Sequence, residues 1–389
     1  MIPITDPATR KSRTGNPPSN RRARRKRLML PTDPVASAAV AGLRYISKTG
    51  AGITRRKVGS GFCFLGLDGK PIRDKEELRR IRSLVIPPAW SNVWICPSPQ
   101  GHLQATGTDV KMRRQYRYHP LYRQIRNHTK FSRMIDFGKV LPSIRERVQN
   151  DLALSGLQRQ KVLATVVRLL ETTFIRIGNV EYARDNSSFG LTTLRNRHVA
   201  VEGSSMTFTF RGKSGQDHEI TIEDRRLARI VKACQDLPGH ELFQYKDDAG
   251  ERHVVDSSDV NAYLHEITGE EFTAKDFRTW AGTVQTALAL TAKPFESETE
   301  AKRNIVEAVK STARLLGNRP ATCRNYYVHP AILESYMEGS LHQILKPTGE
   351  EASLSDGGLQ PDEVSVLAVI RKKEAALVEA LPLNTVSAA

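Results

Sequence analysis

Apolar residues recur along this chain in two patterns, and the change between them falls near residue 130. Before it, short apolar runs at 57–67, 93–96 and 103–106 predict β-strands, and polar amphipathic stretches at 35–47 and 76–83 predict short helices. After it, apolar residues three and four positions apart predict helices. These cover 131–152, 157–177, 225–235, 257–268, 279–290, 298–315 and, at the end of the chain, 361–381.

One hairpin interrupts the helical part. Residues 206–210 alternate polar and apolar side chains, a turn with two glycines follows at 212–215, and a second strand is predicted at 218–222. The whole pattern predicts an α+β fold of two domains: a small β-rich domain at 34–128 and a mainly α-helical domain at 129–346. We expect residues 1–33 to be a disordered basic tail and residues 347–389 to be a linker and a C-terminal helix.

The charge of the chain narrows the class of partner. The 389 residues carry a formal charge of +17. Residues 1–27 contain nine basic residues and one acid, a net charge of +8, so the rest of the chain carries +9. A basic body behind a basic tail favours a polyanionic partner. No apolar run reaches the ~18–20 residues that a membrane span needs. The four cysteines show no CxxC spacing, and no export signal is evident, so we expect a cytoplasmic protein.

Five residues in the helical part could carry chemistry, although each has an ordinary explanation by itself. Lys213 could be a solvated turn lysine, Asn318 a turn residue and Tyr327 a half-buried structural tyrosine. The five are Arg176, Lys213, Arg278, Asn318 and Tyr327.

The two arginines also have ordinary explanations. Arg176 falls in the last turn of the helix predicted at 157–177, where the helix dipole favours a cation. Arg278 could form a surface ion pair with Asp276 or Glu271.

Taken together, these residue types fit covalent chemistry on a phosphodiester. Arginine forks bind phosphate oxygens, and an amide adds a donor to the same cage. A phenol, whose ordinary pKa is about 10, can attack phosphorus when nearby cations favour its anion. A lysine on a hairpin can give a proton to the leaving oxygen. A covalent phosphotyrosine conserves the bond energy, so rejoining needs no ATP.

Other chemistries find less support. No GxxxxGK[ST] loop, HExxH helix or GxSxG elbow is present, and glycines at 59, 61 and 66 lead into a strand rather than a helix. The pair Asp247 and Asp248 is typical of a solvated loop. We therefore expect neither a metal site nor a cofactor.

The motifs and their order resemble those of the type IB DNA topoisomerases, in particular the small poxvirus-like enzymes found in bacteria. The resemblance runs from about residue 35 to the C-terminal helix. It rests on the segments 108–120, 174–179 with Tyr182, 190–198, 212–213, 275–280 and 317–327.

The resemblance implies a role for each of the five residues. Tyr327 is expected to take the 3′-phosphate of the cut strand, Arg176 and Arg278 to stabilise the transition state, and Lys213 to be the general acid. Many relatives have histidine where this chain has Asn318. The family's tyrosine lies nine residues after that position, which selects Tyr327 over its neighbour Tyr326.

The resemblance also implies a DNA-binding surface and a C-shaped clamp around duplex DNA, formed by a monomer associated with the nucleoid. The residues expected to contact double-stranded DNA are Lys111, Arg113, Arg114, Gln115, Tyr116, Tyr118, Asn179 and Tyr182.

Two alternatives remain open from the sequence. A tyrosine recombinase shares the nucleophile and the arginines, but it usually has histidine where this chain has Lys275. A basic DNA-organising protein would bind DNA without cutting it.

Overall fold

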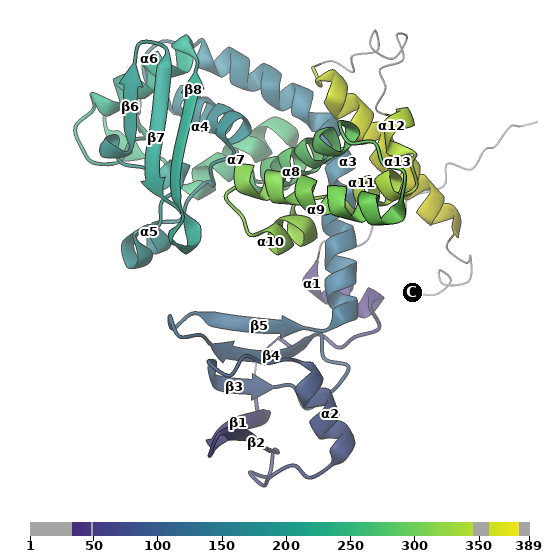
Figure 1. Cartoon of the computed structure of the whole chain (residues 1–389). Helices are drawn as coiled ribbons and strands as arrows, with labels where there is room; N and C mark the ends of the chain where they lie inside the picture. Colours follow the sequence, from purple (N-terminus) through teal and green to yellow (C-terminus); the bar gives the residue numbers. More distant parts are fainter. Residues whose placement is uncertain (1–32, 48–49, 345–357, 381–389) are drawn as a thin grey trace, which may run out of the picture.

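The protein folds into two lobes that one long helix joins (Figure 1). The structure is a computed structural model that describes residues 33–47, 50–344 and 358–380, so the expected basic tail and most of the expected linker lie outside the described residues. Helix α3 (Pro120–Leu152) runs from the small lobe deep into the large one. It passes without a break through residues 128 and 129, where the sequence places the domain boundary. The architecture is the predicted α+β one.

The small lobe is an antiparallel sheet with strand order β2-β1-β3-β4-β5. Its buried core is small and comprises Ile53, Ile81, Val93, Ile95 and Ala105. The single strand predicted at 57–67 is wrong, because a turn with Gly59 at φ +55° divides it into two paired strands. The elements of this lobe are α1 (Pro34–Val40), β1 (Ile53–Val58), β2 (Gly61–Leu65), α2 (Lys75–Ser83), β3 (Ser91–Ile95), β4 (Leu103–Thr108) and β5 (Arg114–Tyr118).

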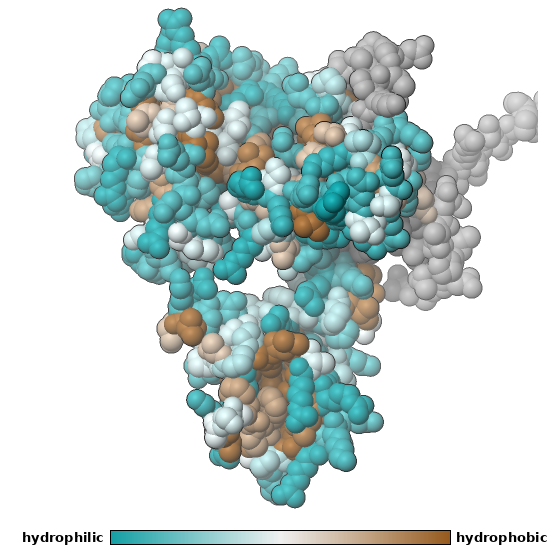
Figure 2. Space-filling view, in the orientation of Figure 1, coloured by the Kyte–Doolittle hydropathy of each residue, from teal (hydrophilic) through white to brown (hydrophobic). Residues whose placement is uncertain are grey.

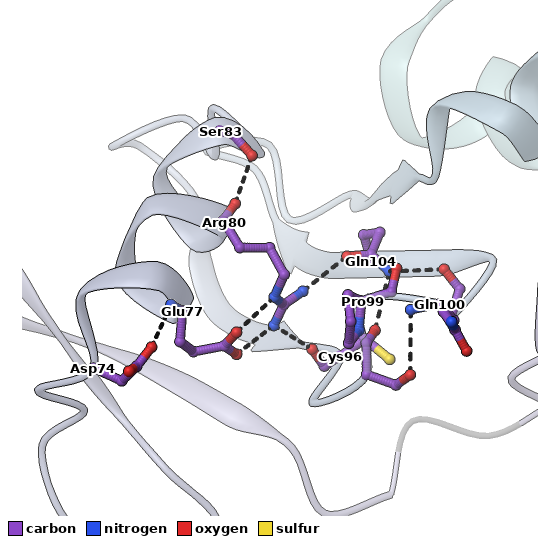
Figure 3. Close-up of polar contacts among 10 residues, drawn as sticks. Asp74, Glu77, Arg80, Ser83, Cys96, Pro99, Gln100 and Gln104 are labelled. Carbon is purple, nitrogen blue, oxygen red and sulfur yellow. Dashed lines mark hydrogen bonds and ion pairs between the residues drawn. The ribbon is translucent and has the colours of Figure 1, made fainter.

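A single arginine fastens α2 to this sheet (Figure 3). Arg80 forms an ion pair with Glu77 on its own helix and donates to the Gln104 side chain (2.8 Å) and to the Cys96 carbonyl (2.9 Å). Gln104 in turn donates to the Gly101 carbonyl (2.7 Å). Each buried polar group in this cluster has a partner, which keeps the cost of burying it low.

The large lobe is helical apart from two small sheets, with strand orders β6-β7-β8 and β10-β9. One continuous apolar core joins its long helices to the inner face of the three-stranded sheet. Among the described residues, no helix is both long and apolar enough to cross a membrane. Its elements after α3 are α4 (Arg159–Thr173), α5 (Val180–Asn186), β6 (Val199–Glu202), β7 (Ser205–Arg211), β8 (Asp217–Glu223), α6 (Arg225–Gln235), β9 (Gln244–Lys246), β10 (Arg252–Val254), α7 (Ser257–Thr268), α8 (Ala274–Thr291), α9 (Glu298–Leu315), α10 (Pro320–Tyr326), α11 (Pro330–Met337), α12 (Leu341–Ile344) and α13 (Pro361–Ala380), with single 3-10 turns at Leu191–Thr193, Asn196–His198 and Lys213–Gly215.

Several predicted helices need new bounds. The prediction for α3 began at 131, but the helix starts at Pro120. Its first turns lie between the two lobes, outside the core of the large lobe, and they lack the apolar periodicity that marks a core helix. The prediction for α8 began at 279, but the helix starts at Ala274, where Thr273 and Asp276 form a capping box. Helix α4 ends at Thr173, four residues early, because Phe174 adopts a left-handed conformation (φ 56°).

Candidate active site

Two arginines from distant parts of the chain converge on the residues just after α9. Arg278, on α8, donates to the Leu316 carbonyl (2.6 Å) and to the Phe174 carbonyl. Arg176 donates to the Gly317 carbonyl (2.8 Å) and to the side-chain oxygen of Asn318. The segment 316–318 therefore holds both guanidinium groups close together.

Arg176 is not part of a helix, which corrects the explanation by the helix dipole. The chain leaves α4 at Phe174 and continues in an extended stretch, where the Arg176 carbonyl accepts from the Leu191 amide (2.8 Å). A Cβ on Gly190 would lie 2.5 Å from that carbonyl oxygen, so only glycine allows this approach. The short stretch is anchored on both sides, which fixes the direction in which Arg176 leaves the backbone.

Arg278 is buried, which corrects the explanation by a surface ion pair. Its exposed fraction is 4%, and Asp276 instead caps α8 while Glu271 is exposed. Burial, and then the neighbouring Arg176, lower the pKa of Arg278 to about 10. The guanidinium thus keeps its charge at neutral pH, in surroundings that penalise that charge.

Tyr327 lies immediately after α10 and packs beside these cations. The Arg278 guanidinium carbon is 5.4 Å from the centroid of its ring. Its main-chain carbonyl accepts from Thr283 Oγ1 on α8 (3.2 Å). Tyr326 is 45% exposed, whereas Tyr327 is partly buried. Arg176, Arg278, Asn318 and Tyr327 therefore form one cluster.

Two donors in this cluster lack an acceptor. Arg278 Nε and Asn318 Nδ2 are buried, and neither makes a hydrogen bond in the described part of the chain. Within the same part, neither Arg176 nor Arg278 pairs with a carboxylate. Buried donors without partners are rare and costly. An anion with several acceptor oxygens would satisfy them and would also balance the positive charge.

Lys213 lies apart from this cluster. It occupies the turn between β7 and β8 and is exposed, and no hydrogen bond or ion pair to it is seen within the described ranges. The predicted hairpin is confirmed, with Phe208 of β7 opposite Ile220 of β8. The side chain of His218, on β8, lies between the turn and the cluster: its ring is next to Gly212 of the turn and to Gly317, which precedes Asn318.

Lys130 also reaches Tyr327, and the predictions from the sequence did not single it out. This lysine lies on α3, donates to the Tyr326 carbonyl, and places its ammonium nitrogen 5.3 Å from the centroid of the Tyr327 ring. Burial, followed by the charge of Lys275, lowers the pKa of Lys130 to about 8. Almost 200 residues separate Lys130 from Tyr327, so only the packing of α3 against the α10 region reveals the contact.

The elements β5 and α5, which carry most of the residues expected to bind DNA, lie on opposite sides of the space between the lobes (Figure 1), and this space is open in the space-filling view (Figure 2). Strand β5 is the edge strand that faces the large lobe (Figure 1). Tyr116 and Tyr118 project from it as exposed, stacked rings with centroids 6.1 Å apart. The Arg114 guanidinium carbon lies 5.9 Å from the Tyr116 ring centroid.

Asp109 organises the turn between β4 and β5. It forms an ion pair with Arg113 (2.7 Å), accepts from the Gln115 side chain (2.9 Å) and accepts from the Lys111 amide (2.9 Å). The hydrogen bond from Arg113 is the main cause that lowers the Asp109 pKa to about 2. Arg113 and Gln115 are therefore held by a carboxylate that a bound phosphate would have to displace or share.

Helix α5 lies across the gap from this turn. Asn179 is its N-cap and accepts from the Tyr182 amide (3.0 Å). Tyr182 is 43% exposed. The pKa of Arg113 is raised mainly by Asp109, with a smaller effect of Tyr182 from the other lobe.

Comparison with known proteins gives a consistent answer for both lobes. The family model described as "Eukaryotic DNA topoisomerase I, catalytic core" matches residues 120–347, and that of "Bacterial DNA topoisomerase IB, N-terminal domain" matches residues 61–109. The DNA topoisomerase 1B of Acanthamoeba polyphaga mimivirus is 36% identical over 293 residues, which are 73% of this chain and 87% of that protein. The DNA topoisomerase 1B of Vaccinia virus (strain Copenhagen) is 27% identical over 64% of this chain and 77% of its own length.

The chain belongs to the type IB DNA topoisomerases. This decides against the tyrosine recombinases and the DNA-organising proteins that the sequence left open. Within the type IB family, this member combines a catalytic core that matches the eukaryotic family model with an N-terminal domain of the bacterial kind.

Proposed function

We propose that this type IB topoisomerase relaxes supercoiled DNA by cutting and rejoining one strand through a 3′-phosphotyrosyl intermediate, without ATP or a metal ion. The observation that carries the proposal is the pair of buried donors without acceptors, Arg278 Nε and Asn318 Nδ2, beside Tyr327. A phosphodiester offers two non-bridging oxygens to such donors. Arginine donors suit this role because they stay charged and bind phosphate in fixed geometry.

In the proposed reaction, the Tyr327 oxygen attacks phosphorus and loses its proton to solvent water as the new bond forms. The bond from phosphorus to the 5′-oxygen breaks, and Lys213 gives that oxygen a proton, which leaves a 5′-hydroxyl. Arg176 and Arg278 stabilise the charge that grows on the non-bridging oxygens. Rejoining reverses these steps: the 5′-hydroxyl attacks phosphorus, its proton returns to Lys213, and Tyr327 leaves and takes a proton from solvent.

We further propose that double-stranded DNA occupies the gap between the lobes, gripped by a monomer in the cytoplasm. The exposed, stacked Tyr116 and Tyr118 lie on β5, the strand of the small lobe next to this gap, and the exposed Tyr182 lies on α5, on the other side of it (Figure 1). The basic surface would supply contacts to phosphates, while aromatic and amide side chains would contact bases or sugars.

Relaxation of a negatively supercoiled plasmid in EDTA and without ATP tests the reaction. The wild type should relax the plasmid and form a covalent adduct with the 3′ end of the cut strand. Tyr327→Phe should abolish both. Tyr326→Phe is the matched control, since it removes the adjacent phenol, and it should leave both in place. Relaxation by Tyr327→Phe, or its loss in Tyr326→Phe alone, would contradict the proposal.

A further inference from the structure

His218 occupies an unusual position, between two glycines that each precede an expected catalytic residue. The ring stacks on Phe210 of β7, with centroids 5.0 Å apart and planes at 16°. One edge of the ring lies against Gly212, which precedes Lys213. The Cε1 side of the ring lies against Gly317, which precedes Asn318.

The contact on both sides is too close for any other residue. A Cβ on Gly212 would lie 2.6 Å from His218 Cδ2 and Nε2, and a Cβ on Gly317 would lie 2.3 Å from Cε1. Gly212 has an ordinary extended conformation (φ −96°), so its backbone does not require glycine. The approach of the imidazole accounts for the missing side chain at this position.

The space around this ring is nearly filled. The crevice that His218, Gly212, Phe210 and Arg176 line holds about 10 Å³, which is room for roughly one water. On its far side, Gly317 is held in place by the bond from Arg176 to its carbonyl (2.8 Å). His218 therefore packs against the part of the active site that binds the arginines.

The turn that carries Lys213 has few other attachments. Its main-chain bonds are internal, from the Gly212 amide to the Gln216 carbonyl (2.7 Å) and from the Gly215 amide to the Gly212 carbonyl (3.1 Å). These bonds shape the turn but do not place it relative to Tyr327. Within the described residues, the His218 ring is the side chain that bridges the turn and the 317–318 segment.

We propose that His218 is the positioning residue for the general acid: its ring docks the Lys213 turn onto the Gly317–Asn318 segment and so sets where Lys213 can deliver its proton. This inference rests on the proposed role of Lys213. It assigns His218 no contact with DNA and no proton transfer of its own.

The electrostatics agree with a packing role. Burial lowers the pKa of His218, and Arg176 and Arg278 lower it further, against a smaller opposite effect of Asp217. The ring is therefore neutral at neutral pH. A neutral, stacked ring can fill the space between two backbones without adding charge to the phosphate cage.

The test compares cleavage of two DNA substrates under single-turnover conditions at saturating enzyme. One has the normal 5′-oxygen at the scissile bond, and the other has a 5′-sulfur, which leaves without a proton. His218→Ala should slow cleavage of the oxygen substrate by about tenfold or more and cleavage of the sulfur substrate by no more than about threefold, since only the first needs the acid. His218→Phe keeps a stacked ring and should recover most of the rate.

Gly212→Ala is the second variant, and it leaves the histidine in place. Its Cβ must push the ring away from the turn, so it should reproduce the selective loss on the oxygen substrate. His253→Ala is the matched control, because it removes another imidazole of a hairpin: His253 on β10 stacks on the ring of Tyr245 on β9. It should leave both rates unchanged.

Lys213→Ala separates failure of this inference from failure of the proposed function. If Lys213→Ala is equally slow on both substrates, Lys213 is not the acid, and the proposed mechanism itself is wrong. If the sulfur rescues Lys213→Ala but not His218→Ala, then His218 acts through the phosphate cage and the positioning role is refuted. An unchanged rate in a folded His218→Ala enzyme refutes it as well.

Discussion

Replacing Gly282 by alanine should displace the Tyr327 main chain and slow DNA cleavage while leaving DNA binding intact. Gly282 lies inside α8, where alanine would ordinarily stabilise the helix by about 1 kcal/mol. Here the new Cβ would lie 2.6 Å from the Tyr327 carbonyl oxygen and 3.0 Å from its Cβ. The first atom belongs to the backbone, so no side-chain rotation can relieve the contact.

The size of the effect follows from these distances. A carbon and a carbonyl oxygen in close contact stay about 3.3–3.6 Å apart, so the Tyr327 backbone must move away by roughly 0.7–1 Å. The same carbonyl accepts from Thr283 Oγ1, and that bond would stretch or break. A shift of about 1 Å at a reacting group can cost about 100-fold in rate. The crowding should also cost about 1–3 kcal/mol of folding free energy, which offsets the gain that alanine would bring to the helix.

The assay is the rate of covalent adduct formation under single-turnover conditions, with DNA affinity measured separately by fluorescence anisotropy. Gly138→Ala is the matched control, since this glycine is also in a helix interior and its Cβ would lie 2.8 Å from Trp280 Cη2, a side-chain atom. It should lower stability and leave the cleavage rate near that of the wild type. Cleavage by Gly282→Ala within about threefold of wild type, well short of the roughly 100-fold loss expected from misplacement, would refute the reasoning.

Two further predictions concern stability. Glu363 on α13 accepts from Arg145 (2.7 Å) and from Trp280 Nε1 (2.8 Å). Arg145 keeps its ion pair with Glu171, so Glu363→Ala should lower the free energy of unfolding by about 1.5–3 kcal/mol in urea titrations. Glu363→Gln keeps the shape and should lose much less; equal losses would show that packing, not the polar network, is responsible. Burial lowers the pKa of His102, His198 and His218, so the unfolded chain takes up protons that the folded chain does not. Stability should therefore be fully present above about pH 6.5 and fall as the pH drops below it, and stability that rises between pH 6.5 and 5.5 would contradict this account.

Local sequence signals were sufficient where a helix has both a strong cap and a clear apolar face. The predicted bounds of α6, α7 and α9 match the structure, and Asp224, Asp256 and Ser297 cap these helices with their side chains. The short helices α10 and α11 were not predicted. They have little apolar periodicity of their own and form where the chain packs against α8 and α9.

Of the candidate site, the sequence could supply residue types and order, and the resemblance supplied the expected roles. It could not show that Arg278 is buried, because that depends on how α8 packs against the segments around Phe174 and Leu316. Nor could it show that Arg176 lies beyond its helix, because that depends on Phe174 ending α4 in a left-handed conformation. Nor could the sequence show that Lys130 and His218 lie at the site, because their contacts there are with residues about 100 to 200 positions away in the chain.

The sequence by itself determined the α+β division and the hairpin with Lys213 in its turn, since apolar periodicity and turn glycines are local properties of the chain. It also determined the family, since the order of the motifs can be seen without knowing how they fold. The tertiary structure alone decided how four of the five candidate residues meet. The carbonyls of residues 316 and 317 bind the buried guanidinium of Arg278 and the half-buried guanidinium of Arg176, and α8 supports the Tyr327 backbone. Burial then raises the cost of unpaired donors and like charges, so these residues become a site for an anion only once the fold has removed them from water.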